Sequence, residues 1–201
     1  MNVAILTFEG FNELDSFIAA GILNRMKAQG WNIYITCPSS HVTSMNGVTV
    51  TAQQPLEFAN TADVVRLGSG ILTRDIAKDE SILNRLKLNP KRQLIGAQCS
   101  GTLLLATLGY LDGLAACTDL TTKPWVVDAG VKVLNQPFNA LNNMATAGGC
   151  MASQYLAAWV ITKLAGHSAA EKAIYYVAPV GEKEAAVKKC MAVVTPYITQ
   201  I

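Results

Sequence analysis

The sequence lacks the features that mark several classes of protein. Its 16 basic and 14 acidic residues leave a formal charge of only +2 over 201 residues. No run of Lys or Arg gathers on one predicted face, so little favours a nucleic acid as partner. No apolar run reaches the roughly 18 to 20 residues that a bilayer span needs, because Gln154 and Lys163 interrupt the best candidate. We therefore expect no membrane partner.

The N-terminus and the cysteines do not follow a secretory pattern either. The opening MNVAILTFEG has neither a basic first segment nor a small-residue cleavage site, so it predicts a first strand rather than a signal peptide. The cysteines are odd in number, widely spaced and without a CxxC pair. We expect a cytoplasmic protein without a zinc site, whose free thiols are Cys37, Cys99, Cys117, Cys150 and Cys190.

About half of the residues are apolar, which is enough to bury a sizeable core, and we expect residues 1–201 to form one domain. Apolar runs of strand length alternate with segments of helical period, and Asn46-Gly47 predicts a small hairpin. This alternation predicts a doubly wound α/β fold, with a mainly parallel sheet and helices on both faces. The predicted strands are 2–8, 32–37, 63–67, 93–98, 115–118 and 143–147; the predicted helices are 12–29, 79–88, 100–109, 150–165 and 168–176, with a further helix and an apolar tail after residue 181.

The most informative stretch is LIGAQCSGTLLLA, which places Cys99 between a predicted strand and a predicted helix. In such sheets ligands collect beyond the carboxyl ends of the strands. The segment AQCSG at 97–101 has the small-x-nucleophile-x-small pattern of a nucleophile elbow, where an unusual backbone conformation demands small neighbours. A helix N-terminus beside the sulfur is expected to lower the thiol pKa. We favour a nucleophile over the alternative, a buried cysteine that acts as a small hydrophobe.

Asp15 is the best candidate for a partner of Cys99. Neither His41 nor His167 is placed for a Cys-His dyad, and no late His-x-Glu pair supports a glutamine-hydrolysing triad. Asp15 opens the first helix at the same predicted sheet edge as Cys99. It either stabilises free helix amides behind the cap residue Asn12, or points into the cleft and serves Cys99 as general acid or base.

These residues resemble the ThiJ/PfpI superfamily and, within it, the isocyanide hydratase branch. The resemblance extends over nearly the whole chain and rests on FNELDSF at 11–17, AQCSGTLLLATLGYLDG at 97–113, AGG at 147–149 and YYVAP at 175–179. It implies a glutamine amidotransferase-like, flavodoxin-like fold and a homodimer, with no metal or organic cofactor. By the same resemblance, Cys99 matches the nucleophile and Asp15 the cleft carboxylate.

Gly68, Ser69 and Gly70 occupy the place of the superfamily's glycine-rich loop, whose backbone amides face the cysteine. Because Thr73 stands where a dinucleotide fingerprint has its third glycine, we interpret the loop as an oxyanion-type donor set. The amide of Ser100 can join this set. The alternatives are an ordinary tight turn for the loop and a helix cap for the Ser100 hydroxyl.

The segment ACTD at 116–119 departs from the superfamily pattern, because many members carry a histidine there beside the cysteine. Its absence weighs against a His-dependent protease, glyoxalase or deglycase. Asp119 in this segment is either a second acid that faces the cleft or an exposed loop residue.

Two further departures lie before the glycine-rich loop. Arg66 interrupts an apolar strand, and a buried unpaired guanidinium would be strongly destabilising. We expect it to reach the cleft edge or to pair with Asp15, Glu13 or an anionic group of the substrate. Leu67 stands where relatives often have proline, so the loop is expected to take a different course.

The residues and the resemblance together predict an enzyme that acts on a small electrophile. The Cys99 thiolate attacks an isocyanide carbon, Asp15 protonates the adduct to a thioimidate and then guides water, and an N-formamide leaves. One alternative is glyoxalase- or deglycase-like aldehyde chemistry through a hemithioacetal. Another is a non-catalytic redox or stress sensor, in which Asp15 hydrogen-bonds an oxidised Cys99.

Overall fold

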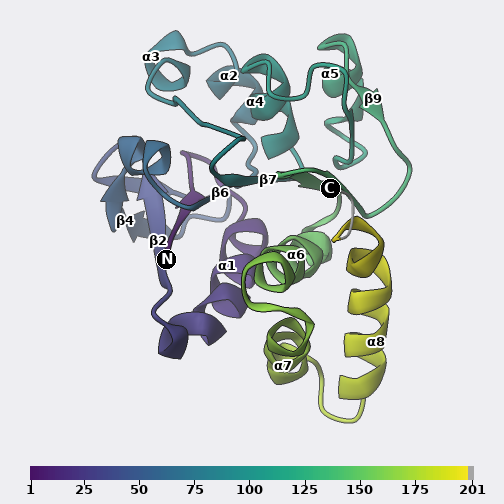
Figure 1. Ribbon diagram of the computed structural model, residues 1–201. Helices are drawn as coiled ribbons and strands as arrows, with labels where there is room; N and C mark the ends of the chain where they lie inside the picture. The colour runs from purple at the N-terminus through teal and green to yellow at the C-terminus, as the bar shows by residue number, and fades with distance from the viewer. Residues whose placement is uncertain (199–201) are drawn as a thin grey trace.

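The computed structural model describes residues 1–198, which form a seven-stranded sheet between two layers of helices (Figure 1). The strand order is β10-β11-β7-β6-β1-β2-β5, and every neighbouring pair is parallel except β10 with β11. The predicted doubly wound, mainly parallel sheet is therefore confirmed. Its strands are β1 (Asn2–Leu6), β2 (Asn32–Cys37), β5 (Gln54–Pro55), β6 (Val64–Leu67), β7 (Leu94–Gln98), β10 (Phe138–Leu141) and β11 (Met144–Ala147).

Helices cover both faces of the sheet. One layer holds α1 (Glu13–Leu23), α6 (Ser153–Ala165), α7 (His167–Val177) and α8 (Lys183–Val194); the other holds α2 (Thr73–Ile76), α3 (Glu80–Leu83), α4 (Gly101–Thr107) and α5 (Lys123–Asp128) (Figure 1). Each layer has its own apolar cluster against the sheet, with Trp159 buried in the first and Leu104 in the second. In the described part of the chain, no helix is long and apolar enough to cross a membrane.

Several short elements complete the chain. The predicted hairpin is confirmed as the antiparallel pair β3 (His41–Thr43) and β4 (Thr49–Thr51). A second small pair joins β8 (Ala115–Ala116) and β9 (Lys132–Val133). Short 3₁₀ segments are η1 (Asn24–Gln29), η2 (Leu56–Asn60), η3 (Cys150–Ala152) and η4 (Thr195–Tyr197).

The predicted helices differ from the observed ones mainly at their ends. The helix predicted over 12–29 is α1 followed by η1, and Gly30 ends it in the left-handed region at φ 80°. The helix predicted over 79–88 is wrong beyond residue 83. There the amides of Lys87 and Leu88 donate to the side chains of Asn60 and Tyr110 instead of continuing the helix.

The C-terminal segment follows its prediction as far as the structure describes it. The helix expected after residue 181 is α8, which buries Cys190, Met191 and Val194 against the first apolar cluster. The predicted apolar tail extends into residues 199–201, which lie outside the described residues.

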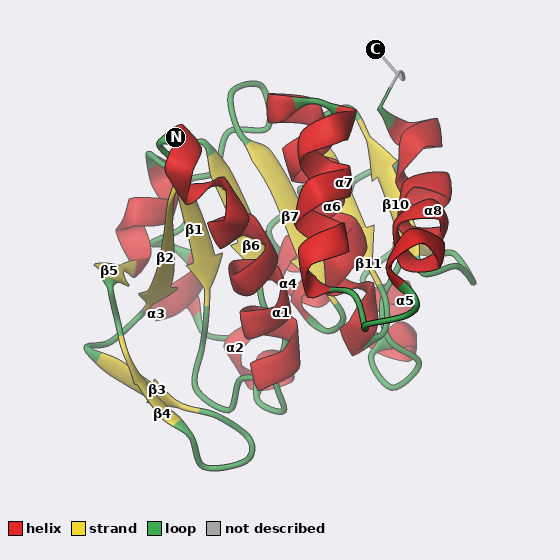
Figure 2. Ribbon diagram, turned by 90° about the horizontal axis from the view of Figure 1, so that it is seen from below, coloured by secondary structure: helices red, strands yellow, loops and turns green. Residues whose placement is uncertain are grey.

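The parallel strands β1, β2, β6 and β7 end on the same side of the sheet (Figure 2). The segments that follow β6 and β7 pack tightly there. Gly101, the first residue of α4, lies directly on the end of β6. A Cβ atom at Gly101 would stand 2.6 Å from the Gly68 carbonyl oxygen and 2.7 Å from that of Leu67. The glycine two residues after Cys99 is therefore required by this close approach, and it brings the cysteine against the loop that follows β6.

We expect Gly101→Ala to lower the free energy of unfolding by about 1–3 kcal/mol, because the added methyl group has no space between two backbones. Gly21 is the matched control. It is also helical, and nothing lies within 4 Å of a Cβ placed on it, so Gly21→Ala is expected to raise stability by about 0.5–1 kcal/mol. Urea unfolding of both variants measures the two effects, and an unchanged stability of Gly101→Ala would contradict the packing argument.

Candidate active site

Cys99 lies at a sharp turn between β7 and α4, with its backbone in the left-handed region at φ 47°. Among residues other than glycine in the described chain, Asn142 alone shares a positive φ. Such a conformation costs on the order of 1–3 kcal/mol and persists when the surroundings enforce it. Here the Cys99 amide donates to the Ala147 carbonyl at 2.8 Å, and the Cys99 carbonyl accepts the Thr118 hydroxyl at 2.8 Å.

A pocket of about 390 Å³ opens above Cys99 at the carboxyl edge of the sheet. Its lining combines thiols, hydroxyls, two carboxylates and a few apolar side chains, and contains neither a basic side chain nor an imidazole. His41 and His167 are both exposed elsewhere. The lining residues are Asn12, Asp15, Met45, Ser69, Gly70, Ile71, Cys99, Ser100, Asp119, Thr121, Thr122, Trp125 and Cys150.

Asp15 is fully buried and belongs to the first turn of α1. The cap of this helix is Asn12, whose side-chain oxygen accepts the Leu14 amide at 3.0 Å. The Asp15 carboxylate is not used for capping. Its Oδ2 accepts the Ser69 hydroxyl, and its Oδ1 has no hydrogen-bond partner within residues 1–198. One buried carboxylate oxygen therefore remains available in the pocket.

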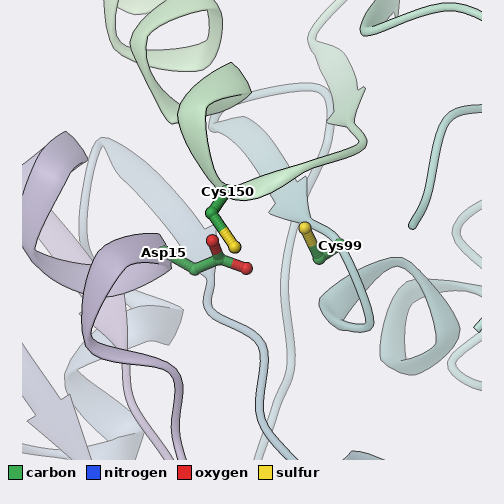
Figure 3. A group of neighbouring side chains, drawn as sticks. All are labelled: Asp15, Cys99 and Cys150. Atoms are coloured by element: carbon green, nitrogen blue, oxygen red, sulfur yellow. The ribbon is translucent and has the colours of Figure 1, made fainter. Parts of the chain in front are cut away.

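Asp15 faces two thiols, because Cys150 joins Cys99 at the same place (Figure 3). A carboxylate oxygen of Asp15 and the Sγ atoms of Cys99 and Cys150 all lie within 4.8 Å of one another. These atoms come from α1, the end of β7 and η3. The three atoms are also close enough together to bind one thiophilic metal ion. No other group of three such ligands is found among residues 1–198.

The environment of Cys99 opposes loss of its proton. Burial raises the pKa of the Cys99 thiol, and the negative charge of Asp15 raises it further. A contact of 3.4 Å from the Gln98 side-chain amide lowers the pKa by a smaller amount. The expected lowering of the Cys99 pKa is therefore wrong in direction, because burial and the charge of the buried Asp15 are the largest causes and both raise it.

Sequence reasoning missed Cys150 as a site residue. It is half-buried, and the side-chain amide of Asn12 lies 3.4 Å from its Sγ. Burial raises the pKa of the Cys150 thiol, and Asp15 contributes in the same direction. The available signal was its position, since Cys150 follows Gly148 and Gly149 directly after a strand that ends at the same edge as β7.

The loop after β6 offers fewer free amides than its glycines suggested. The amide of Gly68 donates to the Leu6 carbonyl at 3.0 Å, and that of Gly70 donates to the Ser100 hydroxyl at 3.1 Å. The amides of Ser69 and Ser100 have no acceptor among residues 1–198. The Ser100 hydroxyl does not cap α4; it holds the loop through Gly70.

Arg66 is buried beneath the pocket rather than at its edge. Its guanidinium donates to the main-chain carbonyl of Asp15, to the Ser153 hydroxyl at 2.9 Å and to the Gln98 side-chain oxygen at 3.3 Å. It forms no ion pair with any described carboxylate. Glu13, a partner considered from the sequence, instead binds the side chains of Ser44 and Asn46. Burial lowers the pKa of the Arg66 guanidinium to about 10.

Asp119 lines the pocket, half-buried, from the segment that lacks the histidine. Its Oδ1 accepts the amide of Thr122 at 2.9 Å, which fixes the turn before α5. Its charge also contributes slightly to the raised pKa of the Cys99 thiol. Asp119 is thus not fully exposed, and it affects the Cys99 thiol less than Asp15 does.

Comparison with known proteins gives a family match and a consistent set of folds. Residues 1–163 match the model of the DJ-1/PfpI family. No curated protein matches the sequence significantly. Among solved structures, DJ-1 of Schizosaccharomyces pombe has a TM-score of 0.76 at 17% identity and covers 89% of this chain and 100% of its own. A ThiJ/PfpI family protein from Pseudomonas syringae has a TM-score of 0.75 at 20% identity and covers 98% and 88%. Drosophila melanogaster DJ-1beta has a TM-score of 0.72 at 17% identity and covers 88% and 96%.

The charge of Asp15 is expected to control the reactivity of the Cys99 thiol. In a Cys150→Ser protein, the rate of Cys99 alkylation by iodoacetamide should keep rising beyond about pH 8.5, the pKa of an ordinary thiol. Adding Asp15→Asn removes a negative charge, so the profile is expected to move to lower pH. Mass spectrometry of the Cys99 peptide across a pH series measures the rate.

Asp119→Asn is the matched control for this measurement, because Asp119 acts on Cys99 in the same direction but more weakly. It should move the alkylation profile the same way by a smaller amount. A profile that Asp15→Asn leaves in place, or moves to higher pH, would show that the carboxylate does not hold the proton on the thiol.

Proposed function

The chain belongs to the DJ-1/PfpI family, and from this premise we propose that it is a cysteine-dependent enzyme that hydrates a small isocyanide to an N-formamide. The observation that carries the proposal is the pairing of Cys99, on its strained elbow, with the unpaired buried oxygen of Asp15. A nucleophile and a proton carrier are together in a pocket whose described lining has no imidazole. Hydration of an isocyanide needs both groups and no histidine.

Burial, and then the charge of Asp15, raise the pKa of the Cys99 thiol, so attack by the sulfur needs a nearby base to take its proton. The free Oδ1 of Asp15 takes the thiol proton as the sulfur attacks the terminal carbon of the isocyanide, so the pair carries one negative charge throughout. Asp15 then delivers this proton to the attacked carbon. The product is a thioimidate bound to Cys99.

Water completes the reaction. Asp15 accepts one proton from the water as the water oxygen attacks the thioimidate carbon, and delivers it to the nitrogen. The second proton of the water passes from the new hydroxyl to the Cys99 sulfur as the carbonyl forms and the carbon–sulfur bond breaks. The N-formamide leaves and the Cys99 thiol is restored, so one isocyanide and one water give one formamide. The free amides of Ser69 and Ser100 are the donors that we assign to the charge developing on the adduct.

The lining favours an uncharged substrate. Ile71, Trp125 and Met45 provide apolar surface, while the two carboxylates repel an anion. Because Arg66 lies beneath the pocket, it does not supply the anion-binding group considered from the sequence. A volume of about 390 Å³ suits a small aryl or alkyl group beside the reacting carbon.

Exposed apolar side chains around the pocket support a homodimer as a second part of the proposal. Ile71 is 62% exposed, Met151 66% and Leu120 82%. A second copy that covered these side chains would remove apolar surface from water and narrow the entrance to the pocket. Sedimentation of the purified chain tests the assembly, and Leu120→Asp should shift it toward the monomer.

We expect the wild type to produce formamide from a small aryl isocyanide, and Cys99→Ser and Asp15→Asn each to reduce turnover by at least about 10²-fold. The loss in Asp15→Asn should occur although its thiol becomes easier to deprotonate, because the proton carrier is gone. Product formation followed by chromatography measures the rates.

Cys190→Ala is the control for loss of a thiol, since Cys190 lies on α8, away from the pocket. It should turn over isocyanide like the wild type. Undiminished turnover in Cys99→Ser would refute the mechanism. If the protein instead turned over glyoxals and no isocyanide, Cys99 and Asp15 would be assigned to glyoxalase- or deglycase-like aldehyde chemistry.

A further inference from the structure

Cys150 is a nucleophilic side chain that isocyanide hydration does not use. Its position follows from the sheet, since β11 lies beside β7 with Ala147 opposite Gln98. Cys99 comes one residue after its strand, and Cys150 comes three residues after the neighbouring strand. The Gly148–Gly149 turn directs Cys150 back over the strand ends, so its sulfur and that of Cys99 lie within 4.8 Å (Figure 3).

We propose that Cys150 resolves an oxidised Cys99, so that this pocket reduces a hydroperoxide and retains the oxidation as an intramolecular disulfide. The activity is separate from isocyanide hydration. It rests on the same cysteine, Cys99, but on no step of isocyanide turnover.

The first step oxidises Cys99 with a hydroperoxide. The sulfur of Cys99 attacks the terminal oxygen, so a sulfur–oxygen bond forms and the oxygen–oxygen bond breaks. The alcohol, or water when hydrogen peroxide is used, leaves with the proton of the Cys99 thiol. The hydroperoxide is reduced, and Cys99 becomes a sulfenic acid.

The second step joins the two cysteines. The sulfur of Cys150 attacks the sulfur of the sulfenic acid, so the disulfide bond forms as the sulfur–oxygen bond breaks. The hydroxide that leaves takes up the proton of the Cys150 thiol and departs as water. The buried Asp15 carboxylate lies within 4.8 Å of both sulfurs and has an unpaired Oδ1 among the described residues, so it is the base positioned to carry this proton.

Cys150 is also the sulfur that is free to move. The elbow of Cys99 is held by backbone hydrogen bonds on both sides. Cys150 begins a 3₁₀ turn of three residues after Gly149, which has φ 90°. Within the described chain, the contact of its Sγ with Asn12 is its only hydrogen bond to a side chain. The two sulfurs lie within 4.8 Å of each other, and a disulfide bond is about 2.05 Å long. We therefore assign the movement that closes this gap to Cys150.

The test is to treat the reduced protein with hydrogen peroxide, with a metal chelator present, and to follow intact mass and free thiols. We expect the wild type to lose two of its five thiols and the mass of two hydrogens per chain, and a dithiol reductant to restore both. Tandem fragmentation of the digest should link Cys99 to Cys150. In Cys150→Ser, Cys99 should instead proceed to a sulfinic acid, with the mass of two added oxygens.

Two controls keep the result specific. Cys190→Ala should behave like the wild type, and Cys150→Ala should behave like Cys150→Ser; circular dichroism confirms that each variant is folded. Sulfinic acid on Cys99 of the wild type at the rate seen in Cys150→Ser would overturn the proposal, as would a disulfide that involves Cys117 or Cys190. Because no isocyanide is present, either result is independent of whether the chain hydrates isocyanides.

Discussion

The buried guanidinium of Arg66 is the interaction on which the arrangement of this site depends. It donates to the Asp15 carbonyl on α1, to the Gln98 side chain on β7 and to the Ser153 hydroxyl at the start of α6. Asp15 lies on α1, Cys99 directly follows β7, and Cys150 lies three residues before α6. One side chain in the middle of the sheet thus sets the distances between a carboxylate and two thiols that are far apart in the sequence. Such a network specifies a single geometry because a lost partner leaves a buried polar group unsatisfied.

The way Arg66 binds α1 also explains why the Asp15 carboxylate keeps one unpaired oxygen. Had the guanidinium paired with the carboxylate, the interaction would have occupied the oxygen that the thiols face and held the charge in place. It takes the main-chain carbonyl instead, while Ser69 binds the other carboxylate oxygen. The positive charge of Arg66 therefore offsets the negative charge of Asp15 from beneath the pocket. Burial lowers the pKa of the Arg66 guanidinium to about 10. The unpaired Oδ1 is left to the pocket.

The sequence predicts those parts of the site that depend on strand ends and local spacing. The elbow around Cys99 and the position of Asp15 follow from two strands that end at one edge of a parallel sheet. The closeness of Cys150 requires the register of β7 against β11 and the path of a Gly-Gly turn, which no local pattern contains. The direction of the Cys99 pKa depends on burial, so a rule about helix termini failed there. The Gly70 amide is not free, because it donates to the hydroxyl of Ser100, thirty residues away in the sequence, and no local pattern predicts this bond.

The same fold in relatives at 16–20% identity does not by itself determine the chemistry, which comes from the residue types in the pocket. In this pocket a histidine is absent from the described lining, and a second thiol is present. Both proposed reactions use the Cys99 sulfur as nucleophile and Asp15 as proton carrier, so they compete for one sulfur. In the proposed hydration, the Cys99 thiol is restored at the end of each cycle. In the proposed hydroperoxide reduction, Cys99 ends in a disulfide with Cys150. If both proposals hold, the disulfide stops hydration until a reductant cleaves it, and Cys150 makes that stop reversible.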